Sequence, residues 1–234
     1  MRKTYLVVGG SSGIGLATTK LLVQNGHSVW VASRNFTEEL QNLGIKHITW
    51  DVNEAADNRF EGIESLDGLV YCPGTINLKP FHRLSRQDFQ NELNINVLGA
   101  IDVLQQTFKQ LKNAPNGASV VLFSTVAATL GMNFHASIAT AKGALEGLAK
   151  SLAAEWAGAQ IRVNVIAPSL TDTPLAAKLL AGEDKKDAAN KRHPLGRVGK
   201  AEDLAEMTYF LLSEKSSWIT GQIIGVDGGM GSLK

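Results

Sequence analysis

This 234-residue sequence has little cysteine and almost no excess of positive or negative charge. Cys72 is the single cysteine, so no disulfide can form within the chain, and no Cys/His cluster has the spacing of a zinc site. We therefore expect no resident metal. The 23 Lys and Arg residues nearly balance 22 Asp and Glu, for a formal net charge of +1. This balance argues against a nucleic-acid-binding protein.

Long hydrophobic runs are also missing. The apolar stretch Tyr5–Val8 ends at Gly9, which is too short for a signal-peptide core or a membrane span. We expect a cytoplasmic protein without a membrane partner. Hydrophobic residues make up 44% of the sequence, and the length suits one globular domain over residues 1–234.

Short β-branched runs alternate with longer amphipathic stretches along the chain. The predicted strands are Tyr5–Val8, Ser28–Ala32, His47–Trp50, Leu69–Cys72, Ser119–Phe123, Arg162–Ile166 and Gln222–Val226. The predicted helices are Gly13–Gln24, Asp88–Leu111, Phe134–Trp156 and Ala201–Leu212, with weaker patterns at Phe36–Leu43 and Ala55–Gly62. This alternation predicts an α/β fold, a doubly wound seven-stranded parallel sheet with helices on both faces.

The stretch Thr173–Lys200 has no strand character and is rich in Pro, Gly and Lys. It is interpreted as a substrate lid with a short helix at Leu175–Leu180. The alternative is a plain solvated crossover.

The first predicted strand leads directly into a glycine-rich loop, Gly9-Gly10-Ser11-Ser12-Gly13-Ile14-Gly15, which opens a helix. Missing side chains allow the backbone to approach a pyrophosphate, and the helix start offers free amides and a positive dipole end. Between a first strand and a first helix, this loop favours phosphate binding over a simple tight turn.

These motifs resemble those of the short-chain dehydrogenase/reductase family. The resemblance covers nearly the whole chain: besides the glycine loop it includes Asn96–Gly99, Lys142–Ala144, Ile161–Asn164, Pro194–Gly199 and Gly221–Gly229. It implies a seven-stranded Rossmann fold that binds a nicotinamide cofactor and forms a homodimer or homotetramer. In the first motif, Val8 stands where the family usually has Thr.

The end of the second strand indicates which cofactor is bound. It carries Ser33 and Arg34 but no acid, and a guanidinium there favours the 2′-phosphate of NADP(H), unless Arg34 is merely solvated. Asp51, followed by Val52, resembles the family's adenine-contacting Asp, although it could simply cap a helix. The resemblance places the remaining cofactor contacts at Cys72, Gly74, Lys142, Pro168, Thr171 and Thr173, with Ser169 in place of the usual Gly.

Reduction of a carbonyl leaves an alkoxide that needs a proton, and the family supplies it from a Tyr four residues before a Lys. Lys142 matches that Lys, but Ile138 stands at the Tyr position. Thr125 falls where the family has its Ser, and Asn96 matches the family's helix Asn. Three of the four positions therefore keep suitable chemistry.

His135 could replace the missing acid. It lies seven residues before Lys142, two helical turns away on nearly the same face, like the Tyr of the family's enoyl reductase branch. A His at this place could also simply cap or pack the helix. His193, within the lid segment, is expected to be solvated.

Two functions remain open from the sequence. The first is an NADPH-dependent oxidoreductase that reduces a carbonyl or an activated alkene with an altered proton donor. The alternative is a catalytically silent NADPH-binding sensor or regulatory protein. Thr125, Asn96 and Lys142 favour chemistry, whereas Cys72 and Ile138 favour silence.

Overall fold

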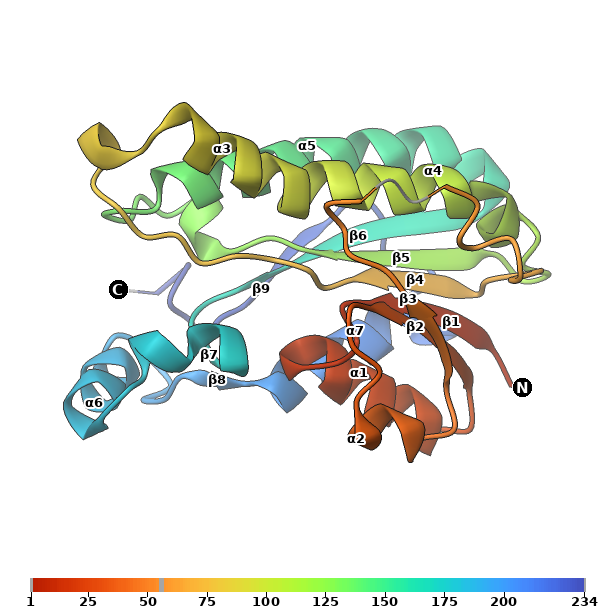
Figure 1. Cartoon of the computed structure of the whole chain (residues 1–234), viewed down its shortest axis with the longest axis horizontal. Helices are drawn as coiled ribbons and strands as arrows, with labels where there is room; N and C mark the ends of the chain where they lie inside the picture. Colours follow the sequence, from red (N-terminus) through yellow and green to blue (C-terminus); the bar gives the residue numbers. More distant parts are fainter. Residues whose placement is uncertain (1, 55–56, 234) are drawn as a thin grey trace.

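The computed structural model describes residues 2–54 and 57–233, which form one α/β unit around a seven-stranded parallel sheet (Figure 1). The strand order is β3-β2-β1-β4-β5-β6-β9, the order of a Rossmann fold with one further strand. The bounds are β1 Thr4–Val8, β2 Ser28–Ser33, β3 Lys46–Thr49, β4 Gly68–Tyr71, β5 Ala118–Phe123, β6 Ile161–Pro168 and β9 Ile223–Val226. The predicted parallel sheet and all seven of its strands are confirmed.

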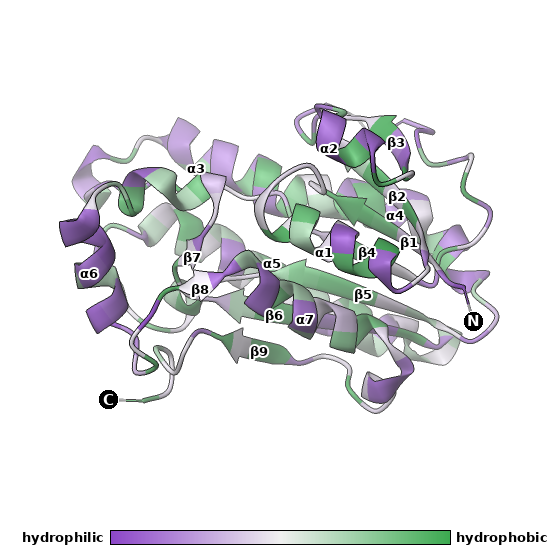
Figure 2. Cartoon of the chain, turned by 90° about the horizontal axis from the view of Figure 1, so that it is seen from below, coloured by the Kyte–Doolittle hydropathy of each residue, from purple (hydrophilic) through white to green (hydrophobic). Residues whose placement is uncertain are grey.

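Alternating side chains of the strands enter two separate cores, one on each face of the sheet. Leu6 and Val8 of β1 belong to the first core, while Tyr5 and Val7 belong to the second. Strands covered on both faces must be apolar throughout, which is why they are green in Figure 2. This explains why short apolar runs sufficed to find them.

Helices cover both faces of the sheet, as predicted (Figure 1). The first core is closed by α4 (Gly99–Lys112) and α5 (Ala136–Trp156), with α3 (Arg86–Leu93) beside them. The second is closed by α1 (Gly13–Gln24), α2 (Glu38–Gln41) and α7 (Ala201–Leu212). The predicted bounds of α1 and α7 are met, and α5 begins two residues later than predicted because Phe134 adopts a φ of 69°.

The helix predicted over Asp88–Leu111 is present, from Arg86 to Lys112, but it is not α-helical throughout. A π-helical turn at Asn94–Leu98 separates α3 from α4. The Tyr71 hydroxyl donates a hydrogen bond of 2.5 Å to the carbonyl of Ile95 within this turn. The π turn rotates the helix at the position of Asn96, and such turns are frequent at functional sites.

The two weaker helix predictions fare less well. Phe36–Leu43 contains only the single turn of α2, capped by the Thr37 hydroxyl. Within Ala55–Gly62, residues 55 and 56 lie outside the described residues, and 57–62 form turns rather than a helix.

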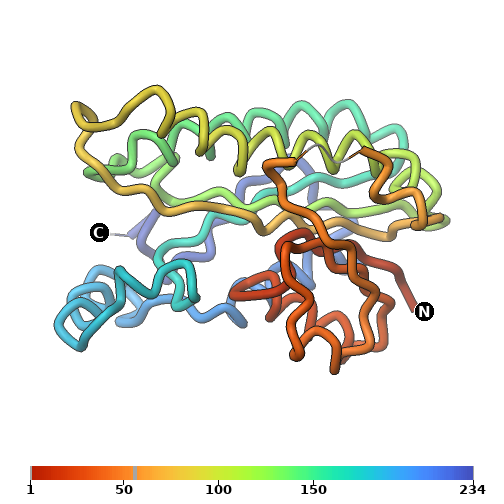
Figure 3. The backbone as a smooth tube through the Cα atoms, viewed as in Figure 1, coloured from red at the N-terminus to blue at the C-terminus, as the bar shows by residue number. Residues whose placement is uncertain are grey.

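The segment Thr173–Lys200 projects beyond the carboxyl edge of the sheet at the end where the C-terminus lies (Figure 3). It contains a 3-10 turn at Pro174–Leu179, where a short helix was predicted, and α6 (Glu183–Lys191), which was not predicted. Two-residue strands, β7 (Thr171–Asp172) and β8 (Gly199–Lys200), pair at its base. Most of α6 is exposed, and its sequence has too few apolar residues for a periodic signal.

Candidate functional site

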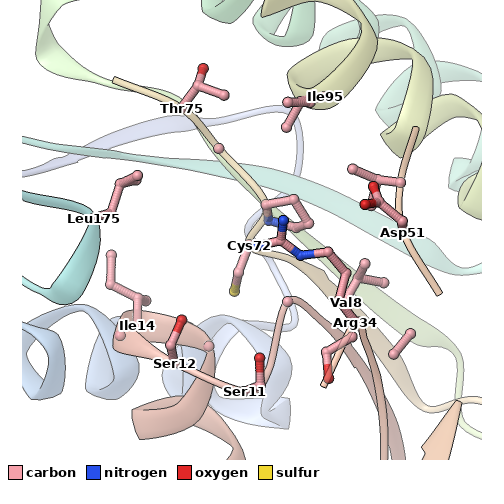
Figure 4. A pocket seen from close by; sticks show the side chains of 18 of the residues that line it. Val8, Ser11, Ser12, Ile14, Arg34, Asp51, Cys72, Thr75, Ile95 and Leu175 are labelled. Carbon is pink, nitrogen blue, oxygen red and sulfur yellow. The ribbon is translucent and has the colours of Figure 1, made fainter. Parts of the chain in front are cut away.

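A cleft of about 460 Å³, which we call the glycine-loop cleft, opens at the carboxyl ends of β1 and β4 (Figure 4). The strand order reverses between these two strands, which is where doubly wound sheets bind ligands. Predicted cofactor residues in its wall are Gly9, Ser11, Ser12, Gly13, Ile14, Gly15, Ser33, Arg34, Asp51, Val52, Cys72, Gly74 and Thr173.

Two glycines of the loop are required by its geometry. Gly13 has a φ of 51°, and a Cβ there would lie 3.3 Å from Cβ of Thr173. A Cβ on Gly15 would lie 2.3 Å from the carbonyl oxygen of Gly9. Within the described chain, the Ser12 side chain caps none of the first amides of α1, so they remain available to an anion.

Ser33 and Arg34 lie at the end of β2, where selectivity for a ribose phosphate was predicted. The Ser33 hydroxyl bonds the Asn35 carbonyl and Nε2 of His47, each at 2.9 Å. Arg34 is exposed, and no ion pair or hydrogen bond within residues 2–54 and 57–233 occupies its guanidinium. Figure 4 shows it on the side of the cleft away from Leu175.

Asp51 lies on the same side of the cleft (Figure 4). Its Oδ1 accepts from the backbone and side-chain nitrogens of Asn53, at 3.0 and 2.9 Å. No helix begins in the described residues that follow, so the cap alternative finds no support there.

A second cavity of about 320 Å³, which we call the Lys142 cavity, adjoins the glycine-loop cleft. The two share Ile14, Cys72, Gly74, Thr75, Thr173 and Leu175, so a ligand can extend from one into the other. The predicted residues Thr125, His135, Lys142, Pro168 and Thr171 line the Lys142 cavity, together with Ile138. Residues predicted for one site from distant parts of the sequence thus come together.

Lys142 is buried at the floor of this cavity. Its ammonium donates a 2.7 Å hydrogen bond to the Phe123 carbonyl. Burial lowers the Lys142 pKa to about 8, although the nearby Glu92 carboxylate favours the charged form. The side chain therefore carries a positive charge at neutral pH, close to the point where the two cavities meet.

Thr125 and His135 line the same cavity as the apolar side chain of Ile138. The Thr125 oxygen accepts from the amide of Ala127 at 3.3 Å, which leaves its hydrogen free to donate. His135 precedes α5, and its Nδ1 bonds the Asn133 carbonyl at 2.7 Å. Because a carbonyl can only accept, Nδ1 carries a hydrogen and Nε2 is the atom left for the cavity. Ile138 is buried and offers no polar atom.

Asn96 lies behind the walls of both cavities and is fully buried on the π turn. Its Nδ2 donates to the Glu92 carbonyl at 2.9 Å, to Oε2 of Glu92 at 3.0 Å and to Oγ1 of Thr75 at 3.1 Å. Its Oδ1 has no hydrogen-bond partner among the described residues. A Cβ on Gly74 would lie 3.5 Å from this oxygen and 3.8 Å from Nζ of Lys142, so Gly74 keeps the space between them open.

The sequence reasoning missed Glu92, which is 2% exposed beside Asn96. One signal was present, since Glu92 lies four residues before Asn96 and so shares its helix face. The sequence did not predict the burial of Glu92, because carboxylates rarely lie in a core without partners.

The expectation that His193 is solvated is wrong. This side chain is 3% exposed, with Nδ1 bonded to the Ala189 carbonyl and Nε2 bonded to Oγ of Ser169, both at 2.8 Å. Ser169, which stands where the family usually has Gly, therefore connects β6 to the end of α6. Both residues line the Lys142 cavity.

Together, the glycine loop, the free α1 amides and the open space beside Gly74 fit an extended phosphorylated dinucleotide. The fold and the cleft define a dinucleotide-binding protein of the doubly wound α/β class. No cluster of three or more potential metal ligands occurs in residues 2–54 and 57–233, and no helix there is long and apolar enough to cross a membrane.

Comparisons with known proteins agree with this class. A family described as enoyl-(acyl carrier protein) reductase matches residues 8–231. The 3-oxoacyl-[acyl-carrier-protein] reductase FabG of Thermotoga maritima is 33% identical over 97% of this chain and 97% of its own length. A short-chain type dehydrogenase/reductase from Mycobacterium ulcerans is 31% identical, covers 99% of this chain and 90% of its own, and superposes with a TM-score of 0.89.

A structure titled ElxO with NADP bound is 26% identical, covers all of both chains and has a TM-score of 0.90. The family match and the relatives span nearly the whole chain. The chain belongs to the short-chain dehydrogenase/reductase family of oxidoreductases.

Proposed function

We propose that this protein is an NADPH-dependent oxidoreductase that reduces a carbonyl or an activated alkene with an altered proton donor. The observation that carries the proposal is the continuity of the glycine-loop cleft with a cavity that contains Lys142 and Thr125. A cofactor lying in the first can present its reactive end to a substrate in the second.

The residues of the glycine-loop cleft would hold the cofactor. The amides at the start of α1 would bind the pyrophosphate, Asp51 and Val52 would contact the adenine, and Lys142 would hold the nicotinamide ribose. Pro168, Thr171 and Thr173 would face the nicotinamide. When bound, the reduced cofactor supplies a hydride; the chain must supply orientation and a proton.

The choice of NADPH over NADH rests on Arg34. Its unpaired guanidinium at the end of β2 suits a 2′-phosphate. Positions 33 and 34 carry no acidic residue that would repel this phosphate. The relative ElxO is described with NADP bound, which supports the same choice.

Thr125 would donate to the substrate oxygen, and His135 would supply the proton in place of a phenol. With Nδ1 committed to the Asn133 carbonyl, the transferable hydrogen is on Nε2 of the imidazolium. A water held by Oδ1 of Asn96 is the other route. An activated alkene requires a less strongly assisted proton transfer from either donor, since the enolate formed is less basic than an alkoxide.

The segment Thr173–Lys200 would act as the substrate lid. Its residues Leu175, Ala176, Leu179, Arg192 and His193 line the Lys142 cavity, so its position determines access. In the cytoplasm we expect a homodimer or homotetramer, as in other members of the family. Nothing in the comparisons favours the alternative of a silent NADPH sensor.

The experiment is a measurement of NADPH oxidation by the purified protein in the presence of diketones, ketones and enones. We expect turnover with at least one class, faster for enones, and a substrate-dependent rate. Tight NADPH binding without turnover of any member of the panel would contradict the proposal and favour a sensor.

A further inference from the structure

The buried carboxyl of Glu92 has no assigned role in the proposed reaction, yet it belongs to a network that reaches the site. Its Oε2 accepts hydrogen bonds from the Thr75 hydroxyl and from Nδ2 of Asn96. The residue lies in the last turn of α3, two residues before the π turn begins at Asn94. A buried carboxyl held by two donors is a defined proton site rather than a surface charge.

Thr75 connects this carboxyl to the catalytic side. It lines the glycine-loop cleft and the Lys142 cavity, and it also borders an open depression on the surface, which we call the outer pocket. Glu92 lines the outer pocket, along with the polar residues Asn77, Asp88 and Asn91, but neither of the two cavities of the site. The Glu92–Thr75 pair therefore stands between the outer pocket and the two cavities of the site.

The charges that face Glu92 come from two elements. Lys142 on α5 favours the carboxylate, and Asp88 on α3, the element of Glu92 itself, disfavours it. Burial is the largest influence and raises the pKa of Glu92, while the hydrogen bonds from Thr75 and Asn96 lower it. The net direction is upward, which brings protonation of this carboxyl closer to neutral pH.

The hydroxyl of Thr75 can be turned toward the site by that protonation. In the structure it donates to the carboxylate and accepts from Asn96 at 3.1 Å. When Glu92 is protonated, its O–H donates to Oγ1 of Thr75 instead. Both lone pairs of Oγ1 are then used by Asn96 and Glu92, so the Thr75 hydrogen must point elsewhere, toward the cavities that Thr75 lines.

We propose that Glu92 is the positioning residue of a second proton route, in which its carboxyl returns protons from the outer pocket to the Thr75 hydroxyl. This inference rests on the proposed reduction. Hydride addition gives the substrate two electrons and one hydrogen and leaves one oxyanion. That oxyanion takes the Thr75 proton, Thr75 takes the Glu92 proton, and the carboxylate takes a proton from solvent through the outer pocket, so each turnover consumes one hydride and one solvent proton.

The test compares Glu92→Gln, Thr75→Val and the control Thr75→Ser, which keeps the hydroxyl. For each we would measure NADPH affinity, kcat against pH with the best enone, and the titration of the Glu92 carboxyl by carbon NMR without cofactor. Glu92→Gln and Thr75→Val should each lower kcat at least 10-fold and remove the same alkaline limb of the pH profile, and Thr75→Val, which leaves the Glu92 charge beside Lys142 in place, should retain the NADPH affinity. The double variant should lose no more kcat than either single variant, because both residues act on the same proton route.

The NMR titration gives a readout independent of activity. Thr75→Val should raise the midpoint of the Glu92 titration, because a hydrogen bond to the carboxylate is lost, and Thr75→Ser should leave it near the wild-type value. If Glu92 only balances the Lys142 charge, Glu92→Gln will weaken NADPH binding while Thr75→Val keeps wild-type kcat, and the inference is overturned. A wild-type protein inert with every substrate overturns the proposed function itself, which separates the two failures.

Discussion

Burial lowers the pKa of Lys142 to about 8, and the carboxylate of Glu92 opposes that shift. An ammonium at this place is held by one carbonyl, that of Phe123, and by its electrostatic interaction with Glu92. Its charge therefore depends on these two neighbours more than on solvent.

Nitrogen NMR of labelled lysines should find one side chain that titrates near pH 8. Glu92→Gln should lower that midpoint further, because the charged form loses its counter-ion. The unfolded chain holds the Lys142 proton more tightly than the folded one between pH 8 and 10.5. The Lys142 contribution to the free energy of unfolding should therefore rise over this window by at most about 3 kcal/mol. An ordinary titration midpoint for every lysine would contradict the buried position.

His135 is tested by replacement with Ala. We expect kcat to fall by about 10² or more if the imidazole donates the proton, with unchanged NADPH affinity. His82→Ala, at an exposed position outside both cavities, is the matched control and should keep the wild-type rate. An unchanged rate for His135→Ala would remove His135 from the mechanism and leave the water route or Thr75.

Ile138→Tyr places a phenol four residues before Lys142. The site is 6% exposed, so the larger side chain should cost about 1–3 kcal/mol of stability, read from thermal or urea unfolding. If only the donor is missing, kcat for ketones should rise more than kcat for enones. A folded but inactive variant would show that the cavity has diverged beyond its proton donor.

At the scale of elements, the junction between the glycine loop and the base of the lid segment leaves little room for a side chain at Gly13. Gly13 combines a φ of 51° with 3.3 Å of space to Thr173, whereas Gly26 has a φ of 78° and no neighbour within 4 Å. A side chain at either position would strain the backbone because φ is positive. Only at Gly13 would the added Cβ also contact a neighbouring residue.

Gly13→Ala and Gly26→Ala should each lose about 1 kcal/mol of stability through the backbone, with a further loss for Gly13→Ala from the Thr173 contact, and the two variants should differ in binding. We expect Gly13→Ala to weaken NADPH binding at least 10-fold by calorimetry, and Gly26→Ala to bind as the wild type does. Equal affinities would mean that the loop does not hold the cofactor.

The elements also show what could be predicted from the sequence. The strands were found because burial on both faces leaves them uniformly apolar, and α1 and α7 because a glycine loop or polar cap bounds them. The π turn at Asn94–Leu98 could not be predicted, since its residues are compatible with an α-helix and the turn depends on Tyr71 and close packing at Gly99. The polar α6 gave no periodic signal because its sequence has too few apolar residues.

Over the whole molecule, the predicted residues of the site meet because the carboxyl ends of the strands share one edge of the sheet. The motifs place Gly13, Arg34 and Thr125 after the carboxyl ends of β1, β2 and β5, so the parallel order brings them to one edge, and Lys142 reaches the same edge from the first turns of α5. The pairs Thr75–Glu92 and Ser169–His193 have no such pattern. Their contacts follow from how the turns after β4 and β6 pack, which sequence spacing does not encode.

The central claim is that the glycine-loop cleft holds NADPH, with its 2′-phosphate at Arg34. Calorimetric titration of the wild type, Arg34→Ala and Lys46→Ala with NADPH and NADH tests it most directly. Lys46 begins β3 and so lies at the amino ends of the strands, away from the cleft at their carboxyl ends. The Lys46→Ala variant controls for the loss of a positive charge. We predict one NADPH per chain, a loss of at least 10-fold in NADPH affinity but little in NADH affinity for Arg34→Ala, and no change for Lys46→Ala. Equal losses for both nucleotides, or no binding by the wild type, would contradict the account.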